Sequence, residues 1–301
     1  MASQMQIVLL AMPGAEQCAN SLGRQLGGEP ASVEVHVFPD GESCPRLPAD
    51  LAGRDVVLVC HLNRPDAKIM QLYLAACTAR ELGARRVGLV LPYLPYMRQD
   101  APFAPGQGVT SCHFAALLST CCDWLVTVDP HLHRHHALSD IYRVPALALP
   151  AAPAIAAWIA GHVPHPLVVG PDGESAQWAR EVARLAQCPV IVLEKIRHGD
   201  HQVEVSATHR QFAGCTPVLV DDIVSTARTM IAATAQLAAS GAAAPVCIAV
   251  HALFAGDALQ ALTRAGAGRI VSCNSVVHAS NRIDLAPVLA EGVRQMLAGT
   301  Q

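Results

Sequence analysis

Two adjacent acids, Asp221 and Asp222, follow an apolar run and precede a cluster of hydroxyl residues in the segment VLVDDIVSTARTM. The apolar run predicts a buried strand, the hydroxyl-rich stretch a short loop, and the residues after it the start of a helix. The backbone N–H groups of such a loop and of a helix N-terminus bind a phosphate dianion. Ser225, Thr226 and Thr229 can add hydroxyl donors to the same phosphate.

The two acids cannot bind that phosphate, because carboxylates and phosphate carry charge of the same sign. They can accept hydrogen bonds from sugar hydroxyls, or they can bind a metal ion. The segment therefore indicates a sugar 5-phosphate that is held at both ends. An acidic strand end followed by an ordinary helix N-terminus is the alternative explanation of the same residues.

Short apolar, β-branched runs alternate with Ala-rich amphipathic stretches along almost the whole chain. Strands that are apolar throughout and alternate with helices predict an α/β fold with parallel sheets covered on both faces. We expect strands at 6–12, 33–38, 55–60, 86–93, 124–129, 167–172, 190–195, 218–222, 246–254 and 269–273. We expect helices at 15–27, 66–83 and 111–121 in the first half, and further helices between the strands of the second half.

Acidic residues come directly after an apolar strand in both halves, at Asp129, at Asp172 and at Asp221 with Asp222. This repetition is a weak sign of internal duplication. Ligands of open α/β sheets bind beyond the carboxyl ends of the strands, which is where these acids are expected to lie. The Pro- and Ala-rich stretch 144–153 is the expected boundary between two domains.

The composition restricts the class of protein. The chain has 301 residues, of which 52% are hydrophobic and 15% charged, so a disordered chain is excluded. The net charge of −3 argues against broad, non-specific binding to nucleic acid or to anionic membranes. The 11 cysteines are scattered and several lie in apolar runs, which indicates buried free thiols in a reducing compartment.

The N-terminal apolar stretch has no basic region before it, so no signal peptide is expected. Two long uncharged windows, at 144–164 and 229–250, are broken by prolines or are too weakly apolar for a membrane span. We therefore expect a cytoplasmic protein with no nucleic acid and no membrane among its partners.

The segment 218–230 resembles the ribose-phosphate-binding motif of the phosphoribosyltransferase superfamily. Five further segments make the chain similar to the ribose-phosphate pyrophosphokinases, which are also called phosphoribosyl pyrophosphate (PRPP) synthetases. These segments, in the family's order and spacing, are FPDGE (38–42), LPYLPYMRQD (91–100), TVDPH (127–131), GPD (170–172) and EKIR (194–197).

The resemblance implies two tandem phosphoribosyltransferase-like domains, each a mainly parallel sheet flanked by helices. Residues 1–147 would form the first, with the nucleotide-binding segments, and residues 148–301 the second, with the ribose-phosphate loop. We allow for the last helix packing back on the N-terminal domain. The implied reaction transfers the β,γ-pyrophosphoryl group of ATP to O1 of ribose 5-phosphate, and gives PRPP and AMP with Mg²⁺ as cofactor.

The resemblance also assigns roles to residues of this chain. Asp221 and Asp222 match the contacts to the ribose hydroxyls. Lys195 and Arg197 match a catalytic basic pair that stabilises charge on the transferred group, and Asp172 matches a metal ligand. The 5-phosphate loop corresponds to Ser225, Thr226, Ala227, Arg228 and Thr229.

The nucleotide is assigned to segments of the first half. Arg98, Gln99 and Asp100 match the family's ATP-binding segment, and His131 matches a position associated with both Mg²⁺ and the ATP phosphates. Residues 101–109 lie where the family has a mobile lid over ATP. The FPDGE turn matches residues that reach adenine from a neighbouring subunit, which implies a homo-oligomer built from dimers with a shared nucleotide site; the matching side chains are those of Phe38, Asp40 and Glu42.

Three other functions stay open at this point. No Lys or Arg stands between Arg98 and Arg134, and Arg228 stands where the family usually has Gly, which favours a catalytically silent relative that regulates an active partner. A phosphoribosyltransferase that consumes PRPP needs only one such domain and no RQD segment. A purely structural α/β protein leaves the ordered set of polar motifs unexplained.

A zinc site is the alternative interpretation of the segment HLHRHH. His131 and His135 are four residues apart and could bind zinc from one helical turn, but no paired Cys-x-x-Cys supplies further ligands. An exposed polar turn is a sufficient explanation of His133, Arg134 and His136.

Overall fold

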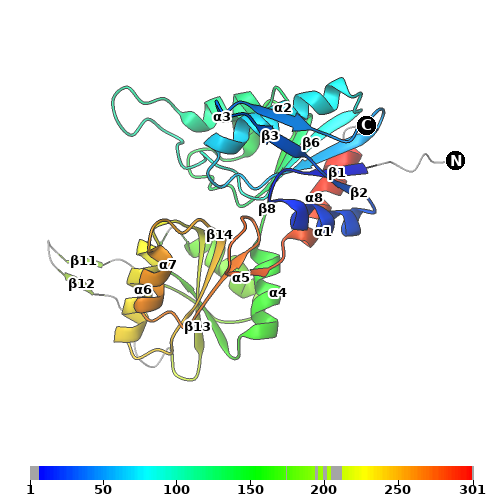
Figure 1. Cartoon of the computed structure of the whole chain (residues 1–301). Helices are drawn as coiled ribbons and strands as arrows, with labels where there is room; N and C mark the ends of the chain where they lie inside the picture. The colour runs from blue at the N-terminus through cyan, green and yellow to red at the C-terminus, as the bar shows by residue number, and fades with distance from the viewer. Residues whose placement is uncertain (1–6, 174, 194–195, 199–201, 205–211, 300–301) are drawn as a thin grey trace. The chain divides into compact units, whose positions relative to one another are not determined.

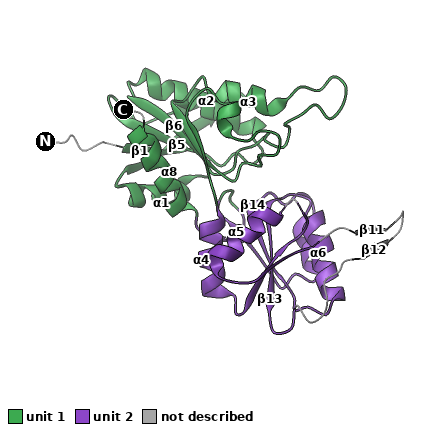
Figure 2. Cartoon of the chain, turned by 180° about the vertical axis from the view of Figure 1, so that it is seen from behind, with its two compact units in different colours: residues 1–150, 275–277, 285–301 green, residues 151–274, 278–284 purple. Residues whose placement is uncertain are grey.

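The computed structural model describes residues 7–173, 175–193, 196–198, 202–204 and 212–299. They form two compact α/β units, drawn in green and purple in Figure 2. Unit 1 contains the chain up to Pro150 together with 275–277 and the residues from Leu285 onward. Unit 2 contains 151–274 and 278–284. The expected α/β fold is confirmed.

The sheet of unit 1 has six parallel strands in the order β2-β1-β5-β6-β7-β8. Every residue of β1, β5 and β7 is buried, as the apolar sequences of these strands predict for a sheet covered on both faces. The bounds are β1 Ile7–Ala11, β2 Glu29–Ser32, β5 Asp55–Val59, β6 Arg86–Leu91, β7 Trp124–Val128 and β8 Ala146–Leu149.

Helices cover both faces of this sheet (Figure 1). Helix α1 (Glu16–Leu26) and the C-terminal helix α8 (Ala286–Gly299) pack together on one face, with α2 (Asp66–Glu81) and α3 (Thr110–Leu118) on the other. A short 3-10 turn, η1 (Leu138–Asp140), precedes β8. Helix α8 comes so close to the sheet that a Cβ atom at Gly292 would lie 2.6 Å from Leu149 Cδ1.

The sheet of unit 2 repeats this topology, with the order β10-β9-β13-β14-β15-β16 and parallel pairing throughout. In both sheets the second strand lies at the edge beside the first, and the other four follow in chain order. The bounds are β9 Pro166–Gly170, β10 Val190–Val192, β13 Thr216–Val224, β14 Val246–Ala252, β15 Arg269–Cys273 and β16 Asn281–Ile283. The repeated order supports an internal duplication.

Helices α4 (Ala152–His162) and α5 (Ala176–Ala186) lie on one face of the second sheet, and α6 (Arg228–Ala239) and α7 (Ala258–Arg264) on the other (Figure 1). Each unit also carries an antiparallel hairpin after its second sheet strand. The hairpins are formed by β3 (Glu34–Val37) with β4 (Ser43–Arg46), and by β11 (Ile196–His198) with β12 (Gln202–Glu204).

Two expectations about elements need adjustment. The run 33–38 does contain a strand, β3, but this strand lies outside the six-stranded sheet, since three of its four residues are exposed and it pairs only with β4. The strand beside β1 in the large sheet is β2, whose sequence EPAS gives no strand signal. The stretch 144–153 contains the division between the units, which falls between Pro150 and Ala151, but the exact boundary expected after 147 was wrong, because 147 lies within β8. No described helix is long and apolar enough to cross a membrane.

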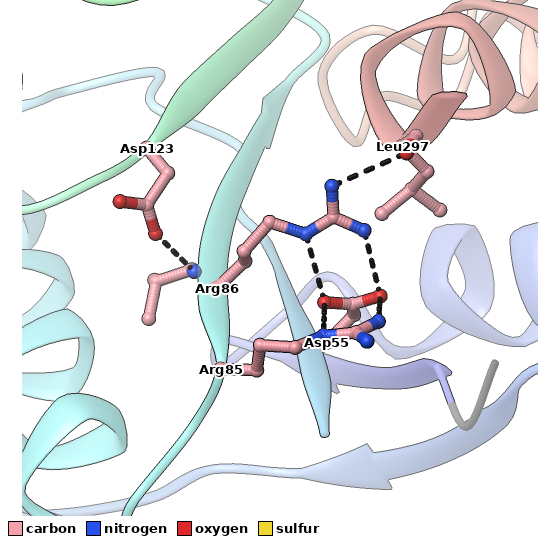
Figure 3. A network of polar contacts seen from close by, with 6 residues as sticks. Asp55, Arg85, Arg86, Asp123 and Leu297 are labelled. Carbon is pink, nitrogen blue, oxygen red and sulfur yellow. Dashed lines mark hydrogen bonds and ion pairs between the residues drawn. The ribbon is translucent and has the colours of Figure 1, made fainter. Parts of the chain in front are cut away.

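A buried ion cluster ties the amino edge of the first sheet to the end of the chain (Figure 3). Asp55, at the start of β5, is 1% exposed and accepts two hydrogen bonds of 2.9 Å from the guanidinium of Arg86. Arg85 donates to the same carboxylate, and Arg86 also donates to the carbonyl oxygen of Leu297 in α8. Burial would raise the pKa of Asp55, but the two arginines outweigh burial and lower it.

We expect the Asp55→Asn variant to lower the free energy of unfolding by about 3 kcal/mol, because it leaves two guanidinium groups without their counter-charge. Because the pKa of Asp55 is lowered on folding, its carboxylate stabilises the fold at every pH above the ordinary carboxyl pKa. This stabilisation is lost as the pH falls through the lowered pKa. Urea unfolding followed by circular dichroism should therefore show the difference at pH 7 and a smaller one in acid. The control is Asp50→Asn, whose side chain is 93% exposed. Equal losses in the two variants would contradict the prediction.

Candidate active site

Asp221 and Asp222 lie inside strand β13, near its carboxyl end. The sequence predicted that the strand would end at these acids, but it continues to Val224. The reason is its neighbour β14, which pairs with the last residues of β13 as Ile223↔His251 and Val224↔Ala252. The acids are therefore fixed by a strand ladder and do not belong to the loop.

On its other side, β13 extends beyond the end of its neighbour β9. Strand β9 ends at Gly170, and its pairing with β13 stops at Leu219↔Val169. The chain also reverses its winding direction here, because β10 lies on one side of β9 and β13 on the other. Such a switch point, at the carboxyl ends of the strands, is where open α/β sheets bind ligands. Asp221 and Asp222 lie at this edge.

A third carboxylate reaches the same edge from the turn after β9. Asp172 accepts a hydrogen bond of 3.1 Å from the backbone N–H of Ser175, whose hydroxyl donates back to the Asp172 carbonyl at 2.7 Å. This reciprocal pair fixes the turn before α5. Burial, with the charges of Asp222 and Asp172, raises the pKa of Asp221 to about 8. Asp222 and Asp172 are thus close enough to Asp221 to affect its ionisation.

The loop at 225–227 turns the chain from β13 into α6. Ala227 has a left-handed backbone with φ 57°, and no side chain caps the helix that follows. The loop is held in place by the segment after β14, since Ala255 N–H donates to the Ser225 carbonyl at 2.9 Å and Phe254 N–H to that of Val224 at 3.0 Å. The first N–H groups of α6 have no intrahelical partner and favour an anion.

The residues expected to hold the 5-phosphate are divided between this loop and the helix. Ser225, Thr226 and Ala227 form the loop, while Arg228 and Thr229 are the first residues of α6. The side chain of Arg228 is exposed. The expected cradle is therefore a strand end, a short turn and a helix N-terminus in direct succession.

In unit 1, Asp100 brings two of the expected nucleotide segments together. Its buried carboxylate accepts a hydrogen bond of 2.8 Å from Arg134 Nη1 and one of 3.3 Å from the Arg134 backbone N–H. Burial would raise the pKa of Asp100, but the contacts with Arg134 outweigh burial and lower it. Arg98 and Gln99, next to Asp100, are exposed. Sequence reasoning assigned Arg134 only to a polar turn, although it is the first cation after Arg98.

The expected lid, 101–109, belongs to the long loop between β6 and α3 (Figure 1). The side-chain oxygen of Gln107 accepts hydrogen bonds of 3.1 Å from the backbone N–H groups of Phe103 and Ala104. The Phe103 ring is 64% exposed and lies below the Arg134 guanidinium, 5.7 Å from ring centroid to Cζ.

The histidines of 131–136 do not lie on an α-helix, so the helical zinc pair does not form. The His131 ring lies beside that of His133 at a tilt of 59°, with centroids 4.3 Å apart, and His135 contacts the Ser111 hydroxyl at 3.3 Å. Within the described ranges, no three His, Cys, Asp or Glu side chains are grouped to hold a metal ion. His131 belongs to unit 1 and Asp172 to unit 2.

The FPDGE segment is the turn between β3 and β4. Phe38 N–H donates to the Glu42 carbonyl at 2.8 Å, and Asp40 accepts a hydrogen bond of 3.2 Å from Glu42 N–H. The Phe38 side chain is 44% exposed, so the turn presents an aromatic ring and two acids to the surface.

One member of the proposed catalytic pair lies on the hairpin of unit 2. Arg197 is in β11, opposite Val203 of β12, whereas Lys195 lies outside the described residues. The strand before the pair, β10, ends at Val192, earlier than the expected 190–195.

Comparison with known proteins gives one family for the whole chain. The pattern of the N-terminal domain of ribose phosphate pyrophosphokinase matches residues 7–121, and that of the phosphoribosyl transferase domain matches residues 141–286. A ribose-phosphate pyrophosphokinase of Methanopyrus kandleri is 33% identical over 293 residues, which cover 96% of this chain and 99% of that protein. The chain belongs to the ribose-phosphate pyrophosphokinase family.

Further relatives agree with this membership and confirm the resemblance inferred from the sequence. A ribose-phosphate pyrophosphokinase of Halobacterium salinarum is 33% identical and covers 95% of this chain and 100% of its own length. The crystal structure of phosphoribosylpyrophosphate synthetase from Mycobacterium smegmatis shares the fold, with a TM-score of 0.83 at 22% identity over 98% of this chain and 99% of that chain.

The raised pKa of Asp221 leads to a test of the site's electrostatics. A carboxyl whose pKa is raised on folding destabilises the fold increasingly as the pH rises from its ordinary pKa of 3.8 to about 8, because a negative charge must form in a half-buried, acidic site. We expect Asp221→Asn to raise the melting temperature at pH 8 by about 3 °C, and by less towards pH 5. Differential scanning calorimetry measures both.

The matched control for this prediction is Asp257→Asn in the same unit. The Asp257 side chain is 78% exposed and pairs with an exposed Arg264, so its removal should change the melting temperature little. A melting temperature of Asp221→Asn below that of the wild type at pH 8 would show that the carboxylate stabilises the fold.

Proposed function

We propose that the chain is an active ribose-phosphate pyrophosphokinase, which transfers the β,γ-pyrophosphoryl group of ATP to O1 of ribose 5-phosphate and releases AMP. The observation that supports this proposal is the arrangement in unit 2: adjacent acids near the end of β13, then a three-residue turn, then the N-terminus of α6. One substrate with a phosphate at one end and hydroxyls at the other fits both parts.

The turn and the helix would bind the 5-phosphate through backbone N–H groups and the hydroxyls of Ser225, Thr226 and Thr229. Asp221 and Asp222 would accept hydrogen bonds from the ribose hydroxyls. These bonds favour the charged form of Asp221 and so offset the burial and the repulsion that raise its pKa. The sugar would thus be fixed with its O1 ready to attack.

The donor set also fits Mg²⁺, which prefers carboxylate oxygens and is commonly held by one or two of them together with substrate phosphates. Asp172 lies close enough to Asp221 to contribute, beside burial and Asp222, to the raised pKa of Asp221. These two carboxylates would hold the ion, with His131 contributing to the nucleotide phosphates. When bound, Mg²⁺ would neutralise charge on the phosphoryl oxygens. No preformed three-ligand group is needed for such a site.

In the reaction, O1 of the ribose would form a bond to the β-phosphorus of ATP while the bond from that phosphorus to the α,β-bridging oxygen breaks. Such transfers depend on positioning and on neutralising charge. Lys195 and Arg197 would supply that charge. Arg98 and Gln99 would bind the nucleotide. Phe38, Asp40 and Glu42 would reach the nucleotide of a neighbouring copy in a homo-oligomer built from dimers. A cytoplasmic location remains a prediction of the sequence.

The proposal is tested by incubating purified protein with Mg²⁺, ATP and ribose 5-phosphate and measuring AMP and PRPP together. We expect both products in equal amounts, and only when ribose 5-phosphate is present. A folded protein that binds ATP but forms neither product would be a silent relative. Consumption of added PRPP with a nucleobase would instead identify a phosphoribosyltransferase.

Replacing Lys195 by Ala should lower kcat by about 100-fold or more, because one charge that stabilises the transferred group is lost. Arg180→Ala, which removes an exposed cation from α5 of the same unit, is the control and should leave kcat unchanged. Steady-state kinetics and circular dichroism are measured on both variants. A Lys195→Ala protein with wild-type kcat would remove this residue from the catalytic group.

A further inference from the structure

The contact between Asp100 and Arg134 joins two loops that follow neighbouring strands. Asp100 follows β6 and Arg134 follows β7, and these strands are paired in the sheet. Both oxygens of the Asp100 carboxylate are used, one by Nη1 and the other by the backbone N–H of Arg134. Both oxygens of the carboxylate therefore contact Arg134, and the side chain is too deeply buried to present a surface of its own to a nucleotide.

The two members of this pair differ in their exposure. The Asp100 side chain is 5% exposed, whereas the Arg134 side chain is 58% exposed. A guanidinium has five N–H donors, and among the described residues Asp100 takes only Nη1. Phe103 lies against one face of the guanidinium, and His135, the residue directly after Arg134, contacts Ser111 of α3. The remaining donors are thus held in one orientation and face solvent.

This part of the chain otherwise has little positive charge. From Gln99 to His133 the sequence contains no Lys and no Arg, so the loop 101–109 offers no cation of its own. A nucleoside triphosphate carries several negative charges that a binding site must neutralise. A guanidinium bound on one edge by a buried carboxylate can bind a phosphate through its other edge.

We propose that Arg134 binds the phosphate groups of the nucleotide and supplies the positive charge that the loop 101–109 lacks. Asp100 is then a positioning residue, which acts on the nucleotide only through Arg134. This inference rests on the proposed function, because it places the nucleotide beside 98–100 and 131–136. It changes the role expected for Asp100, from a nucleotide ligand to the group that orients one.

Calorimetric titration with Mg²⁺ and an α,β-methylene analogue of ATP tests the proposal, and AMP serves as the second ligand. Arg134→Ala should bind the analogue about tenfold more weakly or worse, the equivalent of one charge-assisted hydrogen bond. The loss for AMP should be smaller, because AMP carries fewer phosphate charges. Arg134→Lys keeps the charge without the planar guanidinium, so its affinity for the analogue should lie between those of the wild type and Arg134→Ala. It also provides a second variant if the Ala variant does not fold.

Arg143→Ala is the control, since it removes an exposed cation from the same unit close in the sequence. It should bind both nucleotides as the wild type does. Ribose 5-phosphate should bind equally well to all of these proteins. Equal losses for AMP and the ATP analogue in Arg134→Ala would overturn the proposal, because they would show a displaced loop and not a lost phosphate contact.

The double variant Asp100→Asn with Arg134→Ala separates two roles of the arginine. If Arg134 only neutralised Asp100, removing both charges would restore the binding of the analogue, and the proposal would be wrong. If Arg134 binds phosphate, the double variant stays as weak as Arg134→Ala. A wild-type protein that binds no nucleotide would contradict the proposed function itself, whereas normal binding with no effect of Arg134→Ala would contradict this inference alone.

Discussion

The candidate site depends on the length of β13 relative to its two neighbours. Because β9 stops at Gly170 while β14 continues beside β13, the end of β13 is fixed on one side and open on the other. This geometry places Asp221 and Asp222 near Asp172 at an open edge of the sheet, where their charges oppose one another. The fold alone does not relieve this repulsion, but hydroxyl donors and a cation would. Such local conflict is expected where a sequence serves binding and not stability.

The same topology in unit 1 does not produce the same chemistry. The loop after β5 also contains a left-handed residue before its helix, Arg64 with φ 54°. No adjacent acids precede this residue. Two oxygen atoms of the loop already accept hydrogen bonds from a cation, because Lys68 Nζ donates to the His61 carbonyl at 2.7 Å and to Asn63 Oδ1 at 2.8 Å. Of the two units described, only unit 2 thus carries adjacent acids at its switch point. The same topology supports different chemistry in the two units, because function depends on the residues of the site and not on the fold.

The sequence predicted the α/β class and most sheet strands, because apolar β-branched runs such as 55–59 allow few other structures. It failed at β2, β8 and β16, which are short edge strands whose pairing is decided by tertiary contacts. The acids of β13 were recognised, but the length of the strand was not, since it is set by β14. Arg134 was named without a role, because its partner Asp100 lies 34 positions away in the sequence.

Asp221 carries a raised pKa, and we expect a bound sugar phosphate to lower it again. Calorimetric titration of ribose 5-phosphate at pH 7, in two buffers of different ionisation enthalpy, gives the number of protons exchanged on binding. We expect the wild type to release more protons than Asp221→Asn, because the wild-type carboxyl ionises when the ribose hydroxyls bind to it. Equal proton release and equal affinity in the two proteins would show that Asp221 does not bind the sugar.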